Sequence, residues 1–357
     1  MKQNKQKKIL MVCEAFGGGV FAYVTQLCND MADHFEVFLA YSKRPQTPNN
    51  YKDFLDPRIH LCPVKSWNGK SIFNLINNIK VINELKQIEK AIQPDIIHLH
   101  SSIAGGFGRL AFSNKKNVVY TPHGYAFILM GSGLKSKFYY FVEKILGKRD
   151  CITLTCCESE DEVAKTLCNK TCYIETGLNI KSLENSITCI KPERKDKFTV
   201  FTLGRACVQK QPSLFNRIAQ LVPEARFVWI GDGELENALT DCEVTGWKSR
   251  KEALSMAMDA DAFILCSLGE AIAMSLLENM YLKKLILVSN TMGNKSVIKD
   301  GVNGYLCESA EDYANKLRAA IKNFPSELPK RAHKDVEEIY NSEVSKGKFI
   351  NFYKNLC

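Results

Sequence analysis

Short apolar runs alternate along this chain with longer segments of helical periodicity. A first series of runs typical of buried strands covers residues 9–13, 36–41, 59–64, 96–99, 118–121 and 152–156. A second series covers residues 199–203, 227–230, 244–246, 262–266 and 285–289. Because helical segments separate the strands, the pattern predicts parallel sheets covered by helices, and therefore an α/β protein with two Rossmann-like halves.

The length of the chain fits two domains. A chain of 357 residues is too long for one ordinary core. Residues 183–197 are polar and weakly periodic, so they predict a linker between an N-terminal domain at residues 1–182 and a C-terminal domain at residues 198–333. Residues 334–357 predict one final helix. Residues 71–91 predict another, with apolar side chains at helical spacing: Phe73, Ile76, Ile79, Ile82, Leu85 and Ile88.

Composition and charge restrict the class of protein. There is no apolar run of about 18 residues, as a membrane-spanning helix needs, and the basic start at residues 2–8 lacks the features of a signal peptide, so we expect a cytoplasmic protein. The 14 cysteines form no Cys-x-x-Cys pair and are predicted to be reduced and structural. A net charge of +9 suggests an anionic partner, either a phosphate-bearing ligand or a lipid surface. Nucleic acid is disfavoured because no nucleic-acid motif is present.

The loops after the strands of the first half carry candidate functional residues. Gly17, Gly18 and Gly19 follow the first strand, where their backbone N–H groups suit a diphosphate, although a tight turn without a ligand needs the same residues. His98 and His100 share one face of a strand, but no third ligand has suitable spacing, so no metal is expected. His123 lies in a Pro/Gly-marked loop, where a functional role is favoured.

The second half places charged residues after its strands. Arg205 and Lys210 share one loop at a predicted helix start, which suits a diphosphate, although two cations are also common on any solvated surface. Glu270 lies before another helix and Glu278 about two turns along it, so the pair could hold separate hydroxyl groups of one extended ligand such as a nucleotide sugar. The simpler interpretation is a helix-surface carboxylate and a dipole-stabilising one.

Taken in order, these motifs resemble family 4 of the retaining glycosyltransferases. The resemblance covers nearly the whole chain and rests on the following set: Gly17-Gly18-Gly19, Thr121-Pro-His123-Gly, Gly204-Arg205 with Lys210, Gly231-Asp-Gly233, Gly246-Trp247, Glu270 with Glu278, and Gly301-Val-Asn303-Gly304. It implies the GT-B fold, with two Rossmann-like domains facing a cleft and a C-terminal helix that returns to the N-terminal domain. It also implies metal-independent sugar transfer with retention, without a cofactor.

The resemblance also implies roles for individual residues. Gly18 and Gly19 would meet the diphosphate, Arg205 and Lys210 would neutralise the leaving diphosphate, and His123 would orient the donor sugar. Glu270 would hold sugar hydroxyls and Glu278 the ribose. The remaining donor-binding positions are Trp247, Ala273 and Met274. Two departures from the family pattern, Ala271-Ile272-Ala273 and Met292 with Ser296, bear on sugar selectivity.

The expected function is transfer of a sugar from a UDP- or GDP-linked donor to a glycan or a polyprenyl-diphosphate-linked oligosaccharide in surface polysaccharide synthesis. A sugar-nucleotide epimerase or hydrolase on the same fold, and a non-catalytic nucleotide-sugar-binding subunit, stay as alternatives.

A further expectation concerns the inner face of the cell membrane. Phe138-Tyr-Tyr-Phe-Val142 is surrounded by basic residues in a predicted helix, which suits peripheral binding to an anionic membrane surface: Lys135, Lys137, Lys144, Lys148 and Arg149. The alternative is a helix whose aromatic residues pack into the first domain while its lysines are solvated.

Overall fold

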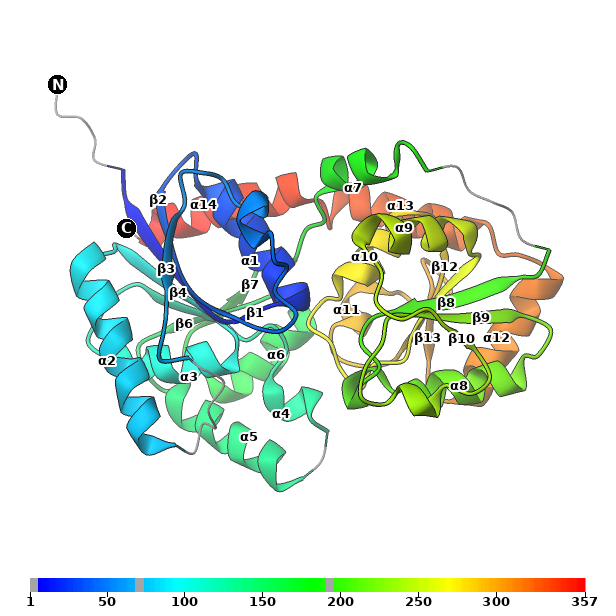
Figure 1. Ribbon diagram of the computed structural model, residues 1–357, viewed down its shortest axis with the longest axis horizontal. Helices are drawn as coiled ribbons and strands as arrows, with labels where there is room; N and C mark the ends of the chain where they lie inside the picture. Colours follow the sequence, from blue (N-terminus) through cyan, green and yellow to red (C-terminus); the bar gives the residue numbers. More distant parts are fainter. Residues whose placement is uncertain (1–5, 68–73, 132, 191–195, 357) are drawn as a thin grey trace. The chain divides into compact units, whose positions relative to one another are not determined.

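The computed structural model describes residues 6–67, 74–131, 133–190 and 196–356, and the chain divides into two compact units. Unit 1 comprises Met1–Phe127, Ser132–Thr176 and Ser345–Cys357, and unit 2 comprises Ile128–Gly131 and Gly177–Val344. Each unit is built around its own parallel sheet (Figure 1).

Unit 1 contains a seven-stranded parallel sheet with the order β3-β2-β1-β4-β5-β6-β7. Its strands are β1 (Lys8–Phe16), β2 (Glu36–Lys43), β3 (His60–Pro63), β4 (Ile96–His100), β5 (Val118–Thr121), β6 (Ile152–Thr155) and β7 (Thr171–Tyr173). The helices that accompany it are α1 (Gly18–Met31), η1 (Tyr51–Phe54), α2 (Leu75–Ile92), α3 (Ser102–Ala111), α5 (Leu134–Leu146), α6 (Glu158–Leu167) and, at the end of the chain, most of α14 (Ser342–Leu356). The short helix α4 (Ala126–Leu129) has residues in both units.

Unit 2 contains a six-stranded parallel sheet with the order β10-β9-β8-β11-β12-β13. Its strands are β8 (Thr199–Leu203), β9 (Arg226–Ile230), β10 (Glu243–Val244), β11 (Ala262–Leu265), β12 (Leu285–Ser289) and β13 (Tyr305–Cys307). The helices are α7 (Ile180–Ile187), η2 (Val208–Lys210), α8 (Pro212–Leu221), η3 (Glu236–Ala238), α9 (Arg250–Asp259), α10 (Met274–Tyr281), α11 (Asn294–Val297), α12 (Ala310–Lys322) and α13 (Glu327–Glu338).

The sheet of unit 2 is buried on both faces. Successive residues of β11 alternate between two cores, with Phe263 and Leu265 in one and Ala262 and Ile264 in the other. Strands buried on both sides are near-continuously apolar, which is why they could be recognised in the sequence. The α/β prediction and the two parallel sheets are therefore confirmed, whereas the three-residue strands β7 and β13 were not predicted.

The predicted linker differs from the structure. Residues 180–187 form α7, and Leu183 is fully buried in a core of unit 2, so the first part of the predicted linker belongs to that unit. The chain instead leaves unit 1 after Thr176. Residues 191–195 of the predicted linker lie outside the described residues.

The prediction of one final helix from residue 334 is wrong. Helix α13 ends at Glu338 and α14 begins at Ser342. Between them the carbonyl of Tyr340 accepts from the N–H of Leu178, and the N–H of Ser342 donates to the carbonyl of Leu178. These bonds to an extended segment, rather than to the preceding helical turn, interrupt the helix.

Helix α14 supplies part of the core of unit 1. Phe349 and Tyr353 are buried in the core cluster that also contains residues of β1, α1 and β2, and Figure 1 shows the red α14 beside the blue α1. Deep inside this unit the hydroxyl of Tyr353 hydrogen-bonds with Nδ1 of His98 at 2.6 Å.

The predicted helix at residues 71–91 buries a different face from the one expected. Residues 71–73 lie outside the described residues, and the described helix α2 buries Asn77, Val81, Leu85, Glu89 and Ile92. Leu75, Ile76 and Ile79 are left exposed. A run of apolar residues at helical spacing indicated a helix correctly but not which of its sides is covered. In the described part of the chain no helix combines the length and the apolar character that crossing a membrane requires.

Candidate functional site

The order of strands in unit 2 reverses between β8 and β11, which are neighbours in the sheet. In parallel sheets, ligands bind beyond the carboxyl ends of strands at such a reversal. The loop that carries Arg205 and Lys210 follows β8, and the loop that carries Glu270 follows β11. Three predicted site residues therefore lie at this edge because of the topology alone.

Lys210 and Glu270 form an ion pair at this edge. Nζ of Lys210 is 2.6 Å from Oε1 of Glu270, and the two side chains are only 19% and 12% exposed. A partly desolvated pair of this kind provides one anchored cation and one anchored carboxylate next to each other. The arrangement suits a ligand that carries both negative charge and hydroxyl groups.

Two glutamines, not predicted from the sequence, join these loops. Nε2 of Gln209 donates to the carbonyl of Gly269 at 3.0 Å, and Nε2 of Gln211 donates to the carbonyl of Cys266 at 2.8 Å. The backbone of Leu268 also donates to the carbonyl of Gln209. These bonds hold Lys210 and Glu270 in place from outside the ion pair itself.

Arg205 lies on the same loop but is held only weakly. Its side chain is 55% exposed, and its Nε is 4.0 Å from a carboxylate oxygen of the equally exposed Glu234. An exposed pair at this distance contributes little, so the guanidinium is available to bind an anion.

Two glycines of this edge are required by close backbone contacts. A Cβ on Gly231 would lie 2.3 Å from the carbonyl oxygen of Gly204, and a Cβ on Gly293 would lie 2.0 Å from the carbonyl oxygen of Ala271. Both glycines also have positive φ angles, of 133° and 84°. Gly231 supports the Arg205 loop and Gly293 the Glu270 loop. Gly293 is thus a site-building residue that the sequence analysis missed, beside the noted departure at Met292.

Helix α10 contributes the second carboxylate. Ala273 precedes the helix and Met274 begins it, and no side chain among the described residues caps that end. Glu278, one turn further on, is largely buried and accepts from Nη1 of Arg250 at 2.7 Å. Burial raises the pKa of Glu278, while the charge and hydrogen bond of Arg250 act in the opposite direction.

Trp247 lies in the loop between β10 and α9, after Gly246, whose φ of 69° favours glycine. The indole is 76% exposed. Ser249 then caps α9 in a capping box with Glu252, which fixes where that helix starts. An exposed aromatic ring beside a rigid helix start is available for stacking against a flat ligand group.

Gly18 and Gly19 belong to unit 1, where the strand order reverses between β1 and β4. Gly18 begins α1 with a φ of 55°, and a Cβ on either glycine would meet nothing within 4 Å. No described side chain caps this helix. The space around both glycines is thus open, and the start of a helix suits an anion.

His123 lies in the same unit, near α1. Its ring packs edge-on against Tyr23 of α1 at 4.6 Å, Nε2 is 3.1 Å from Nδ1 of His100, and Nδ1 is 3.6 Å from Sγ of Cys156. Burial lowers the pKa of His123 to about 3, so the imidazole is neutral at physiological pH. A neutral ring held on both sides suits orientation of a ligand better than charge neutralisation.

The loop of His123 is held by a buried carboxylate that the sequence analysis missed. Glu160 of α6 accepts from the backbone N–H of Gly124 at 2.7 Å and from that of Cys156 at 2.9 Å. Burial raises the pKa of Glu160 to about 7. These two bonds connect the end of β6 to a loop in which His123 and Gly124 both have positive φ angles.

His98, in contrast, has structural partners at both of its ring nitrogens. Nε2 of His98 hydrogen-bonds with Thr121 at 2.8 Å, and its Nδ1 is engaged by Tyr353. Among the described residues there is no cluster of three or more His, Cys, Asp or Glu side chains placed to hold a metal ion, and no disulfide links the described cysteines.

Comparison with known proteins gives matches over both units. The family described as "Glycosyltransferase Family 4" matches residues 17–181, and the family described as "Glycosyl transferases group 1" matches residues 187–338. The chain is 31% identical over 271 residues to the Escherichia coli UDP-Gal:alpha-D-GlcNAc-diphosphoundecaprenol alpha-1,3-galactosyltransferase, which covers 66% of this chain and 68% of that protein.

Two further similarities support this result. A protein of Klebsiella pneumoniae described as an "uncharacterized 41.2 kDa protein in cps region" is 25% identical over 81% of this chain and 84% of its own. The structure of sucrose-phosphate synthase from Thermosynechococcus elongatus superposes with a TM-score of 0.80 at 16% identity, over 98% of this chain and 99% of that one, which shows a shared fold. The chain is a GT-B glycosyltransferase and belongs to the group 1 and family 4 glycosyltransferases.

Proposed function

We propose that this protein transfers a sugar from a nucleotide diphosphate sugar to a hydroxyl group, with retention at the anomeric carbon and without a metal ion. The observation that carries the proposal is the Lys210–Glu270 pair at the strand reversal of unit 2, with Arg205 on the same loop as Lys210. The E. coli relative is named for a UDP-Gal donor, which supports a nucleotide sugar as substrate.

We propose a role for each residue that is consistent with its surroundings. Lys210 and Arg205 neutralise the negative charge that develops on the diphosphate as the glycosidic bond breaks, which is the task a metal ion performs elsewhere. Glu270, held by Lys210, accepts hydrogen bonds from hydroxyl groups of the sugar. Glu278 accepts hydrogen bonds from hydroxyl groups of the ribose, and the exposed ring of Trp247 stacks on the base.

Unit 1 has candidate residues of its own, which we assign separately. Gly18 and Gly19 offer backbone N–H groups to the diphosphate, and the neutral His123 orients the sugar. Ala273 and Met274 bring the start of α10 to the donor. We assign no covalent nucleophile, since the acceptor hydroxyl attacks on the face from which the diphosphate departs.

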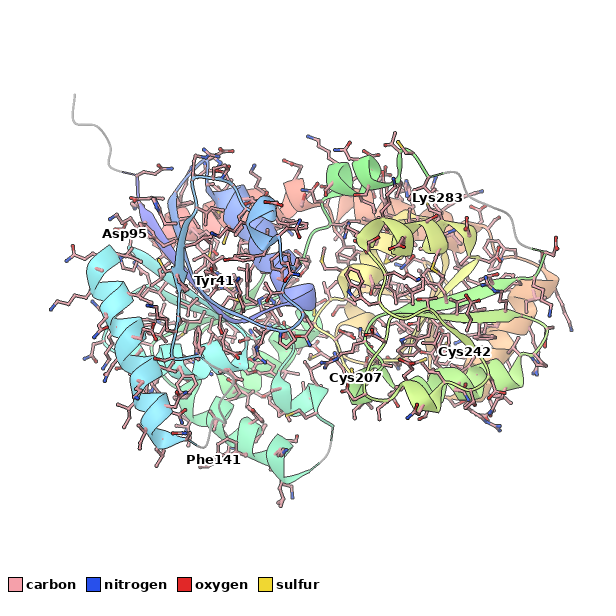
Figure 2. All side chains as sticks on the ribbon, in the orientation of Figure 1. Tyr41, Asp95, Phe141, Cys207, Cys242 and Lys283 are labelled. Carbon is pink, nitrogen blue, oxygen red and sulfur yellow. The ribbon has the colours of Figure 1, made fainter. Side chains whose placement is uncertain are left out.

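The acceptor is proposed to be lipid-linked, because the acceptor named for the E. coli relative is a diphosphoundecaprenol-linked sugar. Helix α5 supports this proposal. It exposes Leu134, Phe138, Phe141 and Ile145, whose spacing of four, three and four residues places them on one face (Figure 2 labels Phe141 at the outer margin of unit 1). Phe141 is thus largely exposed, at 61%, and Phe138 is about half exposed, at 43%.

The opposite face of α5 is anchored inside the unit. The carboxylate of Glu143 accepts from Arg109 and from the hydroxyl of Tyr120, both at 2.8 Å. The exposed face therefore has a fixed orientation, and Leu75, Ile76 and Ile79 of α2 add exposed apolar area from a helix that, like α5, packs on α3. Lysines 135, 137, 144 and 148 around this face give it the charge that an anionic lipid surface attracts.

The proposal is tested by incubating the protein with radiolabelled UDP- and GDP-sugars and a polyprenyl-diphosphate-linked acceptor, with and without chelator. A lipid-linked product whose anomeric configuration matches that of the donor, formed equally with chelator, is expected. Isomerised or hydrolysed donor without product would instead identify an epimerase or a hydrolase. Binding without any chemistry would identify a non-catalytic subunit.

A further inference from the structure

Glu278 and Arg250 come from two helices that meet beside the loop of Trp247. Arg250 is the first residue of α9, where the capping box of Ser249 and Glu252 fixes the helix start, and Glu278 lies in the middle of α10. Nη1 of Arg250 bonds Oε1 of Glu278 at 2.7 Å. The two side chains differ in exposure, at 50% for the arginine and 12% for the glutamate.

This difference matters because a carboxylate loses hydration when it is buried. Burial raises the pKa of Glu278, and the charge and hydrogen bond of Arg250 are what lower it. Without the arginine, the neutral acid would be favoured further. A neutral acid makes weaker hydrogen bonds with hydroxyl groups than a carboxylate does.

The other charged groups near α10 are engaged elsewhere. On α13, which packs against α10, Nδ1 of His333 contacts the carbonyl of Tyr281, and Asp335 pairs with Arg331. Lys284, before β12, donates to two carbonyls at the end of α9. Strands β11 and β12 present no charged residue to α10. Arg250 is thus the cation that acts on Glu278 within the described part of unit 2.

We propose that Arg250 is a positioning residue for nucleotide recognition: it keeps Glu278 ionised and holds one carboxylate oxygen, so that the other accepts the ribose hydroxyls. The proposal rests on the proposed function, in which Glu278 binds the ribose. Arg250 does not need to contact the ribose itself, yet it determines how strongly the ribose is bound. A merely structural ion pair would have no such coupling.

The test measures coupling between Arg250 and the ribose. Wild type is first titrated calorimetrically with UDP-galactose, UDP-glucose, GDP-mannose and ADP-glucose, none of which has a phosphate proton that titrates near neutral pH. The tightest ligand and its 2′-deoxy counterpart are then compared at pH 6 and pH 8. In wild type, loss of the hydroxyl is expected to weaken binding about tenfold at both pH values.

In Arg250→Ala that loss is expected to be smaller than in wild type, most strongly at pH 6, where more of Glu278 is protonated. Arg250→Lys restores the wild-type loss because it keeps the charge. Arg217→Ala is the matched control, since Arg217 is an arginine of the same unit, 57% exposed and 4.0 Å from Glu311. Thermal melts verify that all variants fold.

The outcomes separate the two proposals. If wild type binds none of the four sugar nucleotides, the proposed function fails and this inference fails with it. If wild type binds but Arg250→Ala shows the wild-type deoxy penalty at both pH values, the inference alone is overturned.

Discussion

Replacing Lys210 by methionine is expected to slow transfer strongly and to destabilise unit 2 moderately. Methionine keeps most of the length of the side chain but removes the charge, so Glu270 is left partly buried without its cation. Exposed ion pairs contribute at most about 1 kcal/mol, whereas breaking a buried pair costs about 3–5 kcal/mol. With side chains that are 19% and 12% exposed, this pair lies nearer the buried limit, which gives a loss of roughly 2–3 kcal/mol.

The catalytic effect is expected to be larger than this stability effect. Loss of one contact to developing charge costs about 2.7–4 kcal/mol of barrier, so kcat is expected to fall about 10²–10³-fold. Initial rates at saturating donor report the first effect, and calorimetric melting reports the second as a shift of roughly 5–10 °C. In the double variant Lys210→Met/Glu270→Gln the unpaired carboxylate is gone, so stability is expected to recover while activity is not.

Lys330→Met provides the control. Lys330 pairs with Glu327 at a similar 2.7 Å, but the two side chains are 63% and 79% exposed, so neither melting nor rate is expected to change. A wild-type kcat in Lys210→Met would refute the proposed action on the leaving diphosphate. Equal melting shifts for Lys210→Met and Lys330→Met would refute the argument from burial.

Three further predictions concern other parts of the molecule. Arg205→Ala is expected to lower kcat about 10²-fold or more, whereas Glu278→Ala is expected mainly to raise the Kd of the donor. Steady-state kinetics measure kcat and calorimetry measures Kd. A change of the same parameter in both variants would contradict this prediction. Burial raises the pKa of Glu160 from its ordinary 4.5 to about 7. Between these pH values the folded state keeps a proton that the unfolded state has lost. The contribution of Glu160 to the free energy of unfolding is therefore expected to fall by about 3 kcal/mol as pH rises through this window, and to stay constant above it. Urea titrations of wild type and Glu160→Gln measure this difference, and parallel pH profiles would contradict it. The protein is expected to sediment with anionic liposomes at low salt but not with neutral liposomes. The test variant replaces four lysines by Glu: Lys135, Lys137, Lys144 and Lys148. If this variant sediments as the wild type does, α5 is not the membrane contact.

The sequence predicted the charged residues of unit 2 because of where parallel strands end. Arg205, Lys210 and Glu270 each follow a strand that could be recognised from its apolar residues, and neighbouring strands bring such residues to one edge. The contributions of Gln209, Gln211 and Gly293 could not be predicted in the same way. Their importance comes from contacts between loops that are far apart in the sequence, and nothing in their local pattern distinguishes them from ordinary polar or turn residues.

Helical periodicity likewise predicted where helices form better than it predicted which core covers their apolar sides. The apolar residues Val336, Tyr340, Phe349 and Tyr353 all lie in the segment predicted to form one final helix, but the first two are buried in unit 2 and the last two in unit 1. Backbone bonds with Leu178 lie at the break between the two helices. The periodicity of an apolar stripe contains no information about which core receives it.

The contribution of α14 to unit 1 has a consequence for the order of folding during synthesis. Residues 1–176 are synthesised long before Phe349 and Tyr353, yet both aromatic side chains belong to the core of unit 1. Tyr353, whose hydroxyl bonds His98, follows it by 255 residues in the sequence. Unit 2 ends at Val344, so the last residues of the chain to be synthesised, Ser345–Cys357, belong to unit 1. The unit that is synthesised first is therefore completed last, and a chain that lacks its final turns leaves the core of unit 1 without Phe349 and Tyr353.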